Sequence, residues 1–130
     1  MALNDTLANA LSHLLNCEKR GKKICVIRPI SNFMVKVMEL LKEHGYIGDF
    51  KVSKDRKGGQ MEINLLGNIN KCGAIKPRFS VSYKELEKYE KRFLPAKDFG
   101  IIILTTTKGL LTHIQAKEQK IGGKLVAYCY

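Results

Sequence analysis

The sequence predicts an α+β fold of two small packed modules. The N-terminal α/β module, with the order α-β-α-β-β, covers residues 1–66, and a C-terminal, mainly β module with short helices covers residues 67–130. Three observations predict this division. Apolar residues recur at helical spacing over residues 3–18, and the period changes to two after Tyr46. Residues 67–77, "GNINKCGAIKP", are rich in turn formers and mark the boundary.

The first module begins with an amphipathic helix over residues 3–18, because its leucines and alanines form a one-sided stripe. Asn4 is placed to cap this helix, and Gly21 can end it within the basic turn "EKRGKK". The β-branched run "ICVIRP" then predicts a strand at residues 24–28 that is stopped by Pro29, which cannot donate to a strand ladder.

A second helix should follow Ser31 or Asn32, one of which caps it, and should stop at Gly45. Alternating apolar residues before and after "SKDRKGGQ" predict a hairpin with a basic, glycine-rich tip. The motif "GYIG" matches the G-x-x-G loop of K-homology RNA modules, but here it joins a helix to a strand. A helix cap at Gly45 and a strand bulge at Gly48 are sufficient to explain the two glycines, so the match does not indicate a K-homology module.

The second module begins with a short strand in "RFSVSY" and a charged helix in "KELEKYEKRFL" that Pro95 ends. Glu85, Glu87 and Glu90 are spaced to pair with neighbouring lysines, which is typical of a solvated helix face. Residues 101–105 form an apolar run that predicts a buried strand.

The end of the chain predicts one more helix and one more strand. Thr112 and Gln115 have the spacing of a capping box, so a helix should run from about residue 113 to 119. We expect Gly122 and Gly123 to end this helix, and "KLVAYCY" to close the chain as a strand.

The net charge points to a polyanionic partner. Lys and Arg number 23 against 12 Asp and Glu, which gives a formal charge of +11. Residues 1–70 carry 11 basic and 7 acidic residues, and residues 71–130 carry 12 and 5, so both modules contribute. A surplus of this size on a small globular protein repels itself unless an anionic partner balances it.

No apolar run approaches the roughly 18 residues of a membrane span, and "MALNDTLANAL" resembles neither a secretory signal nor a transit peptide. We therefore expect a cytosolic protein with no membrane partner. The cysteines form no Cys-x-x-Cys pair and have no close histidine, so we expect no metal, no cofactor and four buried free thiols. These residues are Cys17, Cys25, Cys72 and Cys129.

The stretch "LTTTKGLL" lies between the apolar run "IIIL" and a helix start, at the kind of strand–loop–helix junction where phosphates often bind. A nucleotide-triphosphate loop needs the order G-x-x-x-x-G-K-[ST], because the lysine reaches the phosphates and the hydroxyl after it holds magnesium. Here the hydroxyls precede Lys108 and Gly109 follows it. The motif is therefore not a nucleotide loop.

Catalytic constellations are not visible, because His13, His44 and His113 are far apart in the sequence. One alternative stays open: a small enzyme whose phosphorylated substrate is held at Lys108, with His113 as its acid or base. Basic residues gather instead at the turns "EKRGKK", "KDRKGG", "INKCGAIKPR" and "TTKG", where side chains can reach a phosphate backbone. Because the few aromatic residues lie mainly on apolar faces, structured RNA fits better than single strands.

The order of several stretches closely resembles the universal family of the eighth protein of the small ribosomal subunit, in its archaeal and eukaryotic branch. The stretches are "IRPIS", "KEHGYIGDF", "NINKCGAIKPRF", "LPAKDFGIIILTTTKG" and "GGKLVAYCY", and they run in order over almost the whole chain. The resemblance implies a structural, non-enzymatic protein that is a primary binder of the central domain of small-subunit ribosomal RNA and supports subunit assembly and translation. Neighbouring small-subunit proteins are further implied partners.

The resemblance also implies which residues contact RNA. The main surface is formed by the hydroxyl-Lys-Gly loop, the double glycine and an aromatic of the last strand, which are by position Thr105, Thr106, Thr107, Lys108, Gly109, Gly122, Gly123, Lys124 and Tyr128. Secondary contacts come from Arg28, Ser31 and the basic turns, with Arg56, Lys57, Lys71 and Arg78.

Two positions depart from the family's pattern. Thr107 stands where serine is usual, which adds a methyl group, and Lys117 stands where arginine is usual, which removes a forked donor. Lys124 occupies a position where the bacterial branch tends to have an acid, which favours the archaeal and eukaryotic branch. A free regulatory protein that binds messenger RNA through the same surface is a third hypothesis, and it is compatible with the ribosomal one.

Overall fold

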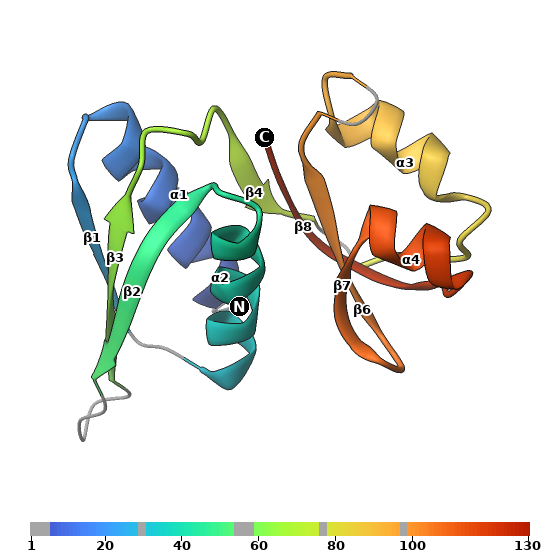
Figure 1. Cartoon of the computed structure of the whole chain (residues 1–130), viewed down its shortest axis with the longest axis horizontal. Helices are drawn as coiled ribbons and strands as arrows, with labels where there is room; N and C mark the ends of the chain where they lie inside the picture. The colour runs from blue at the N-terminus through green and yellow to red at the C-terminus, as the bar shows by residue number, and fades with distance from the viewer. Residues whose placement is uncertain (1–5, 29–30, 54–58, 76–77, 97–98) are drawn as a thin grey trace, which may run out of the picture. The chain divides into compact units, whose positions relative to one another are not determined.

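The computed structural model of the chain describes residues 6–28, 31–53, 59–75, 78–96 and 99–130. The chain divides into two compact units, Met1–Lys71 and Cys72–Tyr130 (Figure 1). Both contain helices packed on antiparallel sheets, so the predicted α+β class is confirmed. No helix within the described ranges is long and apolar enough to cross a membrane.

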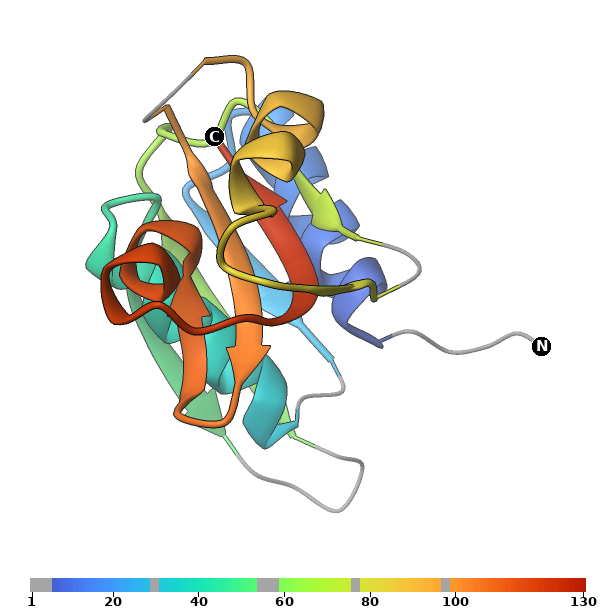
Figure 2. The same cartoon turned by 90° about the vertical axis from the view of Figure 1, so that its right-hand side faces the viewer.

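The N-terminal unit places two helices on one face of a three-stranded antiparallel sheet of order β1-β3-β2 (Figures 1 and 2). Its elements are, in chain order, α1 (Thr6–Lys19), β1 (Ile24–Ile27), α2 (Asn32–Glu43), β2 (Ile47–Ser53) and β3 (Gln60–Leu65). In β1, Cys25 and Ile27 are buried while Ile24 and Val26 are exposed, as expected for a strand with helices on only one side. The predicted order α-β-α-β-β is confirmed.

Local signals set the ends of α2. Ser31 is the N-cap, because its hydroxyl accepts a hydrogen bond from the Met34 N–H at 3.2 Å. After the helix, Gly45 has a φ of +78°, a left-handed conformation that glycine adopts without steric cost. The pairing of β2 with β3 then shifts register between Ile47 and Phe50, so the bulge expected in "GYIG" is present.

Two predictions for this unit lie outside the described residues: the cap at Asn4, and the hairpin tip with Arg56 and Lys57. The predicted strand at 24–28 is one residue too long, because β1 ends at Ile27.

The C-terminal unit is a five-stranded antiparallel sheet of order β4-β8-β6-β7, with β5 also paired to β8. Its elements are β4 (Cys72–Ala74), β5 (Ser80–Val81), α3 (Leu86–Phe93), β6 (Ile101–Thr106), β7 (Gly109–Thr112), α4 (His113–Gln119) and β8 (Gly123–Cys129). Leu86 of α3 and Ala116 of α4 join Ile102, Leu104 and Leu125 of the sheet in one buried cluster. The helices are therefore held on the sheet by apolar packing.

Two strands of this unit were not predicted. The sequence predicts turns over residues 67–77, but β4 pairs there with the end of β8, with Cys72 opposite Cys129. Three residues are too few to show a period of two, so tertiary pairing alone defines this strand. β7 lies where the sequence predicts a loop, and the strand expected in "RFSVSY" is reduced to Ser80–Val81.

The capping box of α4 is confirmed, since the Thr112 hydroxyl accepts from the Gln115 N–H and the Gln115 side chain accepts from the Thr112 N–H. The prediction that Gly122 and Gly123 end this helix is wrong. Lys120 takes the left-handed position instead, with a φ of +57°. The double glycine has a different role, described below.

A buried polar cluster joins α3 to α4. Glu90 is only 5% exposed, so the prediction of a solvated face is wrong at this position. Its carboxylate forms an ion pair with the Lys117 ammonium, and its Oε1 atom lies 3.7 Å from His113 Nε2, beyond hydrogen-bond range. Oε1 has no hydrogen bond of good geometry in the described part of the chain, so its charge is balanced mainly by Lys117.

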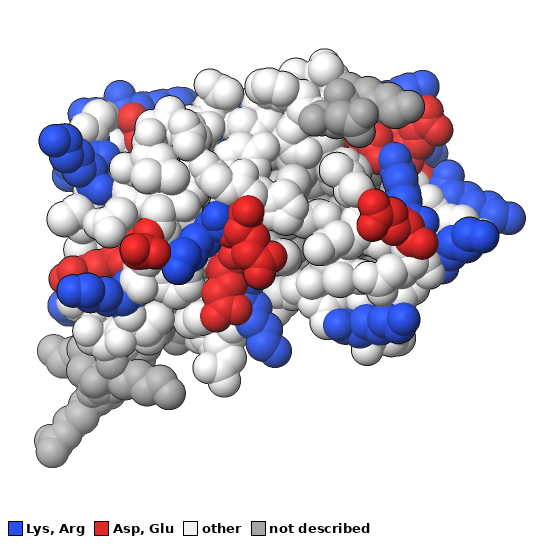
Figure 3. Space-filling view, in the orientation of Figure 1, with Lys and Arg blue, Asp and Glu red and all other residues white. Residues whose placement is uncertain are grey.

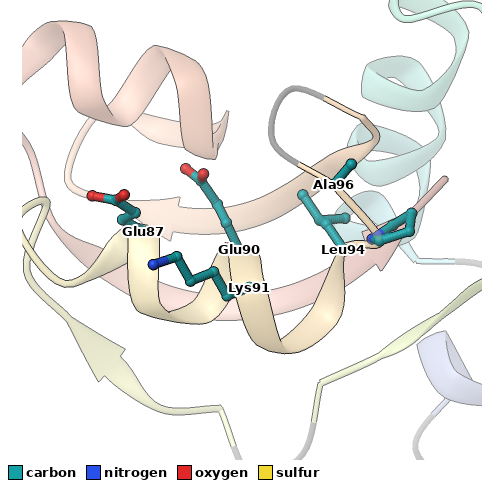
Figure 4. A pocket seen from close by; sticks show the side chains of 6 residues that line it. Glu87, Glu90, Lys91, Leu94 and Ala96 are labelled. Atoms are coloured by element: carbon teal, nitrogen blue, oxygen red, sulfur yellow. The ribbon is translucent and has the colours of Figure 1, made fainter.

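His113 is itself buried and has a defined role in the backbone. Its Nδ1 atom accepts a hydrogen bond from the Ile102 N–H at 3.1 Å, which leaves Nε2 to carry the proton in the neutral ring. Beside Glu90, a hollow of about 220 Å³ is lined by residues of α3 and the segment after it (Figure 4). Figure 4 shows Glu87, Glu90 and Lys91 on the helix, with Leu94 and Ala96 beyond them.

We expect Lys117→Ala to lower the free energy of unfolding by about 2 kcal/mol, because it leaves the buried Glu90 carboxylate without its counter-charge. This value is below that for a fully buried pair, since the Lys117 side chain is 36% exposed and water can partly replace it. Urea denaturation followed by circular dichroism measures the loss. Lys117→Arg, which keeps the charge, should retain most of the stability.

The double variant Glu90→Gln with Lys117→Ala should be more stable than the sum of the two single losses predicts. Strictly additive losses would contradict the ion pair.

Candidate nucleic-acid interface

The "LTTTKGLL" stretch is a β-hairpin, and the prediction of a strand–loop–helix junction is wrong there. β6 and β7 pair down to Thr106 and Gly109, which leaves a two-residue turn at Thr107 and Lys108. Gly109 has a φ of +99°, a conformation that glycine adopts without steric cost. The helix starts only after β7, at the cap Thr112.

The Thr106 side chain closes this turn. Its hydroxyl donates to the Gly109 carbonyl oxygen at 2.8 Å and accepts from the Lys108 N–H at 3.1 Å. Thr106 therefore organises the loop, and its hydroxyl is already engaged. Thr107 and Lys108 stand exposed at the tip. Within the described ranges, no hydrogen bond engages the Thr107 hydroxyl and no acidic group pairs with Lys108.

An open hollow of about 570 Å³ lies beside the hairpin. Its lining comes from three separate segments of the C-terminal unit, which are residues 80–82, 105–107 and 122–124. The sheet pairing brings them together, because Lys124 lies opposite both Thr105 of β6 and Ser80 of β5. Six of the predicted RNA contacts thus share one surface, which we call the hairpin groove: Thr105, Thr106, Thr107, Gly122, Gly123 and Lys124.

The double glycine permits the close packing that forms the groove. A Cβ atom on Gly122 would lie 2.4 Å from the Val81 carbonyl oxygen, and one on Gly123 would lie 2.3 Å from the Thr105 carbonyl oxygen. Any other residue would push the start of β8 away from β5 and β6. These glycines are thus required by the fold itself, and only their partly exposed backbone is left to meet a ligand.

Tyr128 does not line the groove. It lies four residues beyond Lys124 on β8, or about 13 Å along the strand. Its ring stacks on Phe93 at a centroid distance of 5.6 Å and on Tyr130 at 6.3 Å, as part of an aromatic row. The row is packed against the core of the unit, so the structure gives Tyr128 a packing role.

The other predicted contacts are not brought to the groove. Arg28 is exposed and donates to the Gln60 side chain, Ser31 caps α2, and Lys71 is exposed at the end of the N-terminal unit. Arg78 is exposed just before β5. Arg56 and Lys57 lie outside the described residues. These positions stay predictions.

Two groove residues were missed from the sequence. Ser80 and Ser82 line the hollow, and the Ser82 hydroxyl donates to Glu85 at 3.2 Å. Their signal was the alternation in "SVS", which places both hydroxyls on the face opposite the buried Val81. Nothing local in the sequence shows that this face lies beside β8.

Charge is distributed over the surface. On the face seen in Figure 3, Lys and Arg side chains occur over both units with Asp and Glu side chains among them. Among the described residues, this face therefore has no single broad basic patch that could bind an anionic ligand. Local groups must place it, such as Lys108 and Lys124 around the groove.

The cysteines are as predicted in two respects: all four are buried, and none is in a disulfide. The expectation that no histidine lies near them is wrong, because His13 Nε2 lies 3.8 Å from Cys17 Sγ. His13 and Cys17 are four residues apart on one helix face, a spacing that the sequence did contain. Cys25 lies near both.

Comparison with known families decides the identity. The model of the family described as Ribosomal protein S8 matches residues 5–130. The chain belongs to this family. Its members are structural proteins of the small ribosomal subunit that bind ribosomal RNA and neighbouring ribosomal proteins, and they are not enzymes. The alternative of a small enzyme is thereby excluded, and the buried His113 of the structure is in any case engaged with the Ile102 backbone.

We expect Gly122→Ala and Gly123→Ala each to lower the free energy of unfolding by about 1–3 kcal/mol, because the added methyl group overlaps a backbone oxygen. Urea denaturation measures this loss without any RNA present. Gly73→Ala is the matched control, since the atoms nearest to its added Cβ belong to the Tyr128 side chain, at 3.1 Å or more, and not to a backbone oxygen at 2.3–2.4 Å. Equal losses at all three glycines would contradict the packing role.

Proposed function

We propose that this family member is a primary binder of the central domain of small-subunit ribosomal RNA, that it belongs to the archaeal and eukaryotic branch, and that it supports subunit assembly and translation in the cytoplasm. The observation that carries the proposal is the hairpin groove, in which three segments far apart in the sequence present hydroxyls, glycine backbone and the Lys124 ammonium on one surface.

The chemistry of the groove suits a folded RNA backbone. Serine and threonine hydroxyls and backbone N–H groups can contact phosphate and ribose oxygens without reading the sequence. Lys108 at the turn and Lys124 at the start of β8 add two positive charges near the groove. Small side chains allow a ribose-phosphate backbone to approach closely, and A-form RNA is read mainly by such shape and backbone contacts.

The N-terminal unit supplies secondary contacts in this proposal. Arg28 and Ser31 flank the segment between β1 and α2 and are both exposed, and the basic turn after α1 adds further cations. Such contacts raise affinity through phosphate neutralisation while adding little selectivity. RNA recognition is thereby divided between a shaped groove in one unit and dispersed cations in the other.

Binding of the full chain to a transcript of the RNA central domain, measured over a series of salt concentrations, tests this role. Lys108→Ala should reduce the slope of log affinity against log salt by about one, as the loss of one phosphate contact does. Lys91→Ala removes an exposed cation of α3, outside the groove, and should leave the slope unchanged. Identical slopes for both variants would remove Lys108 from the interface.

Two substitutions of Thr107 separate its hydroxyl from its methyl group. Thr107→Ala should weaken RNA binding by about 1 kcal/mol, because one hydrogen bond is lost. Thr107→Ser keeps the hydroxyl and removes the methyl, so its affinity should equal or exceed that of the natural protein. A Ser variant as weak as the Ala variant would show that the methyl contact, and not the hydroxyl, matters.

A further inference from the structure

We propose that His13, Cys17 and Cys25 form a binding site for one zinc ion within the N-terminal unit. Their ligand atoms, the imidazole nitrogen and the two sulfurs, all lie within 4.8 Å of one another. This site shares no residue with the hairpin groove and goes beyond the proposed RNA-binding function.

The distances agree with the geometry of zinc. Tetrahedral zinc has Zn–S bonds of about 2.3 Å and Zn–N bonds of about 2.0–2.1 Å, which place a sulfur and a nitrogen ligand about 3.6 Å apart. The observed distance from Cys17 Sγ to His13 Nε2 is 3.8 Å. The other two distances in the cluster, from Cys25 Sγ to the His13 nitrogen and to Cys17 Sγ, are at most 4.8 Å. Movements of about 1 Å would bring these atoms to the ligand spacings of one zinc ion.

Two rigid elements hold the ligands. His13 and Cys17 are one turn apart on α1, so their side chains lie on the same face of the helix. Cys25 is on β1, and it belongs to the buried face of that strand, the face on which α1 packs. Because helix and strand are already packed together, the cluster is formed before any ion binds.

The burial of the three residues resembles that of an accessible metal site. Cys17 is 4% exposed and Cys25 is 1% exposed, whereas His13 is exposed. The ion would enter on the histidine side and keep water as its fourth ligand there.

The ligand set selects the class of metal. Thiolate and imidazole ligands suit zinc, whereas calcium and magnesium require oxygen ligands. Binding converts two thiols to thiolates and so releases two protons for each zinc ion bound. The resulting centre, one doubly charged cation with two thiolates and a neutral imidazole, has no net charge, which suits a half-buried position.

A bound ion would fasten the C-terminal half of α1 to the first strand. The basic turn after α1, with Arg20, Lys22 and Lys23, directly follows this point. The metal would therefore stabilise the N-terminal unit and limit the movement of a turn that presents three cations.

Titration of the reduced, metal-free full chain with Co²⁺, followed by displacement with Zn²⁺, tests the site. We expect one ion per chain, an absorption band from thiolate-to-cobalt charge transfer, and a higher midpoint of thermal unfolding with Zn²⁺. Calorimetry in buffers of different ionisation enthalpy should show the release of two protons.

The decisive variant is His13→Ala, because an exposed side chain can be removed without disturbing the core. It should weaken Zn²⁺ binding at least about 10-fold, since even indirect partners of a metal ligand contribute that much. Cys17→Ala and Cys25→Ala should each weaken binding and reduce the charge-transfer band, because one of the two thiolates is lost. The matched controls are His44→Ala, at the end of α2, and Cys129→Ala, a buried thiol of the other unit; both should bind as the natural protein does.

Three outcomes would overturn the proposal. The first is the absence of a charge-transfer band in the reduced protein. The second is unchanged affinity in His13→Ala. The third is a cobalt affinity and charge-transfer band that are unchanged in either the Cys17 or the Cys25 variant. A disulfide between Cys17 and Cys25 that forms in air, together with the first outcome, would instead identify a redox pair.

Discussion

The close approach of the start of β8 to the backbones of β5 and β6 is the constraint on which the C-terminal unit depends. Gly122 and Gly123 lie against the Val81 and Thr105 carbonyl oxygens so closely that no side chain fits between them. This contact brings the ends of three strands together. The surface they form is therefore lined by glycine backbone, by short hydroxyl side chains and by Lys124.

The same constraint explains why the Gly-Gly-Lys segment serves both the packing of the strands and the proposed contact with RNA. A motif such as Gly-Gly-Lys is easily interpreted as a ligand-binding signature alone. Here the two glycines are fixed by strand packing, and the lysine after them is the first residue of β8 whose side chain is well exposed. Folding therefore places the cation, and the exposed glycine backbone beside it follows from the same packing.

Much of the fold could be predicted from local signals. The capping residues Ser31 and Thr112, the stop at Gly45 and the buried run at residues 101–104 all lie where the sequence indicates. Failures occurred where distant residues decide. β4 exists only because the end of β8 pairs with it, and the buried Glu90 carboxylate has its counter-charge, Lys117, on α4. The sequence predicts only part of the groove for the same reason, because sheet pairing alone brings the hydroxyls of Ser80 and Ser82 to it.

The hairpin turn has a further consequence for the kinetics and thermodynamics of association. Because Thr106 bonds to both Lys108 and Gly109, the loop has already lost its conformational freedom when the chain folds. A ligand that docks there does not have to order the backbone, so less of the interaction energy is spent on entropy. The turn is a preorganised contact. A ligand that meets it in the correct orientation can bind without a change in the backbone of the loop.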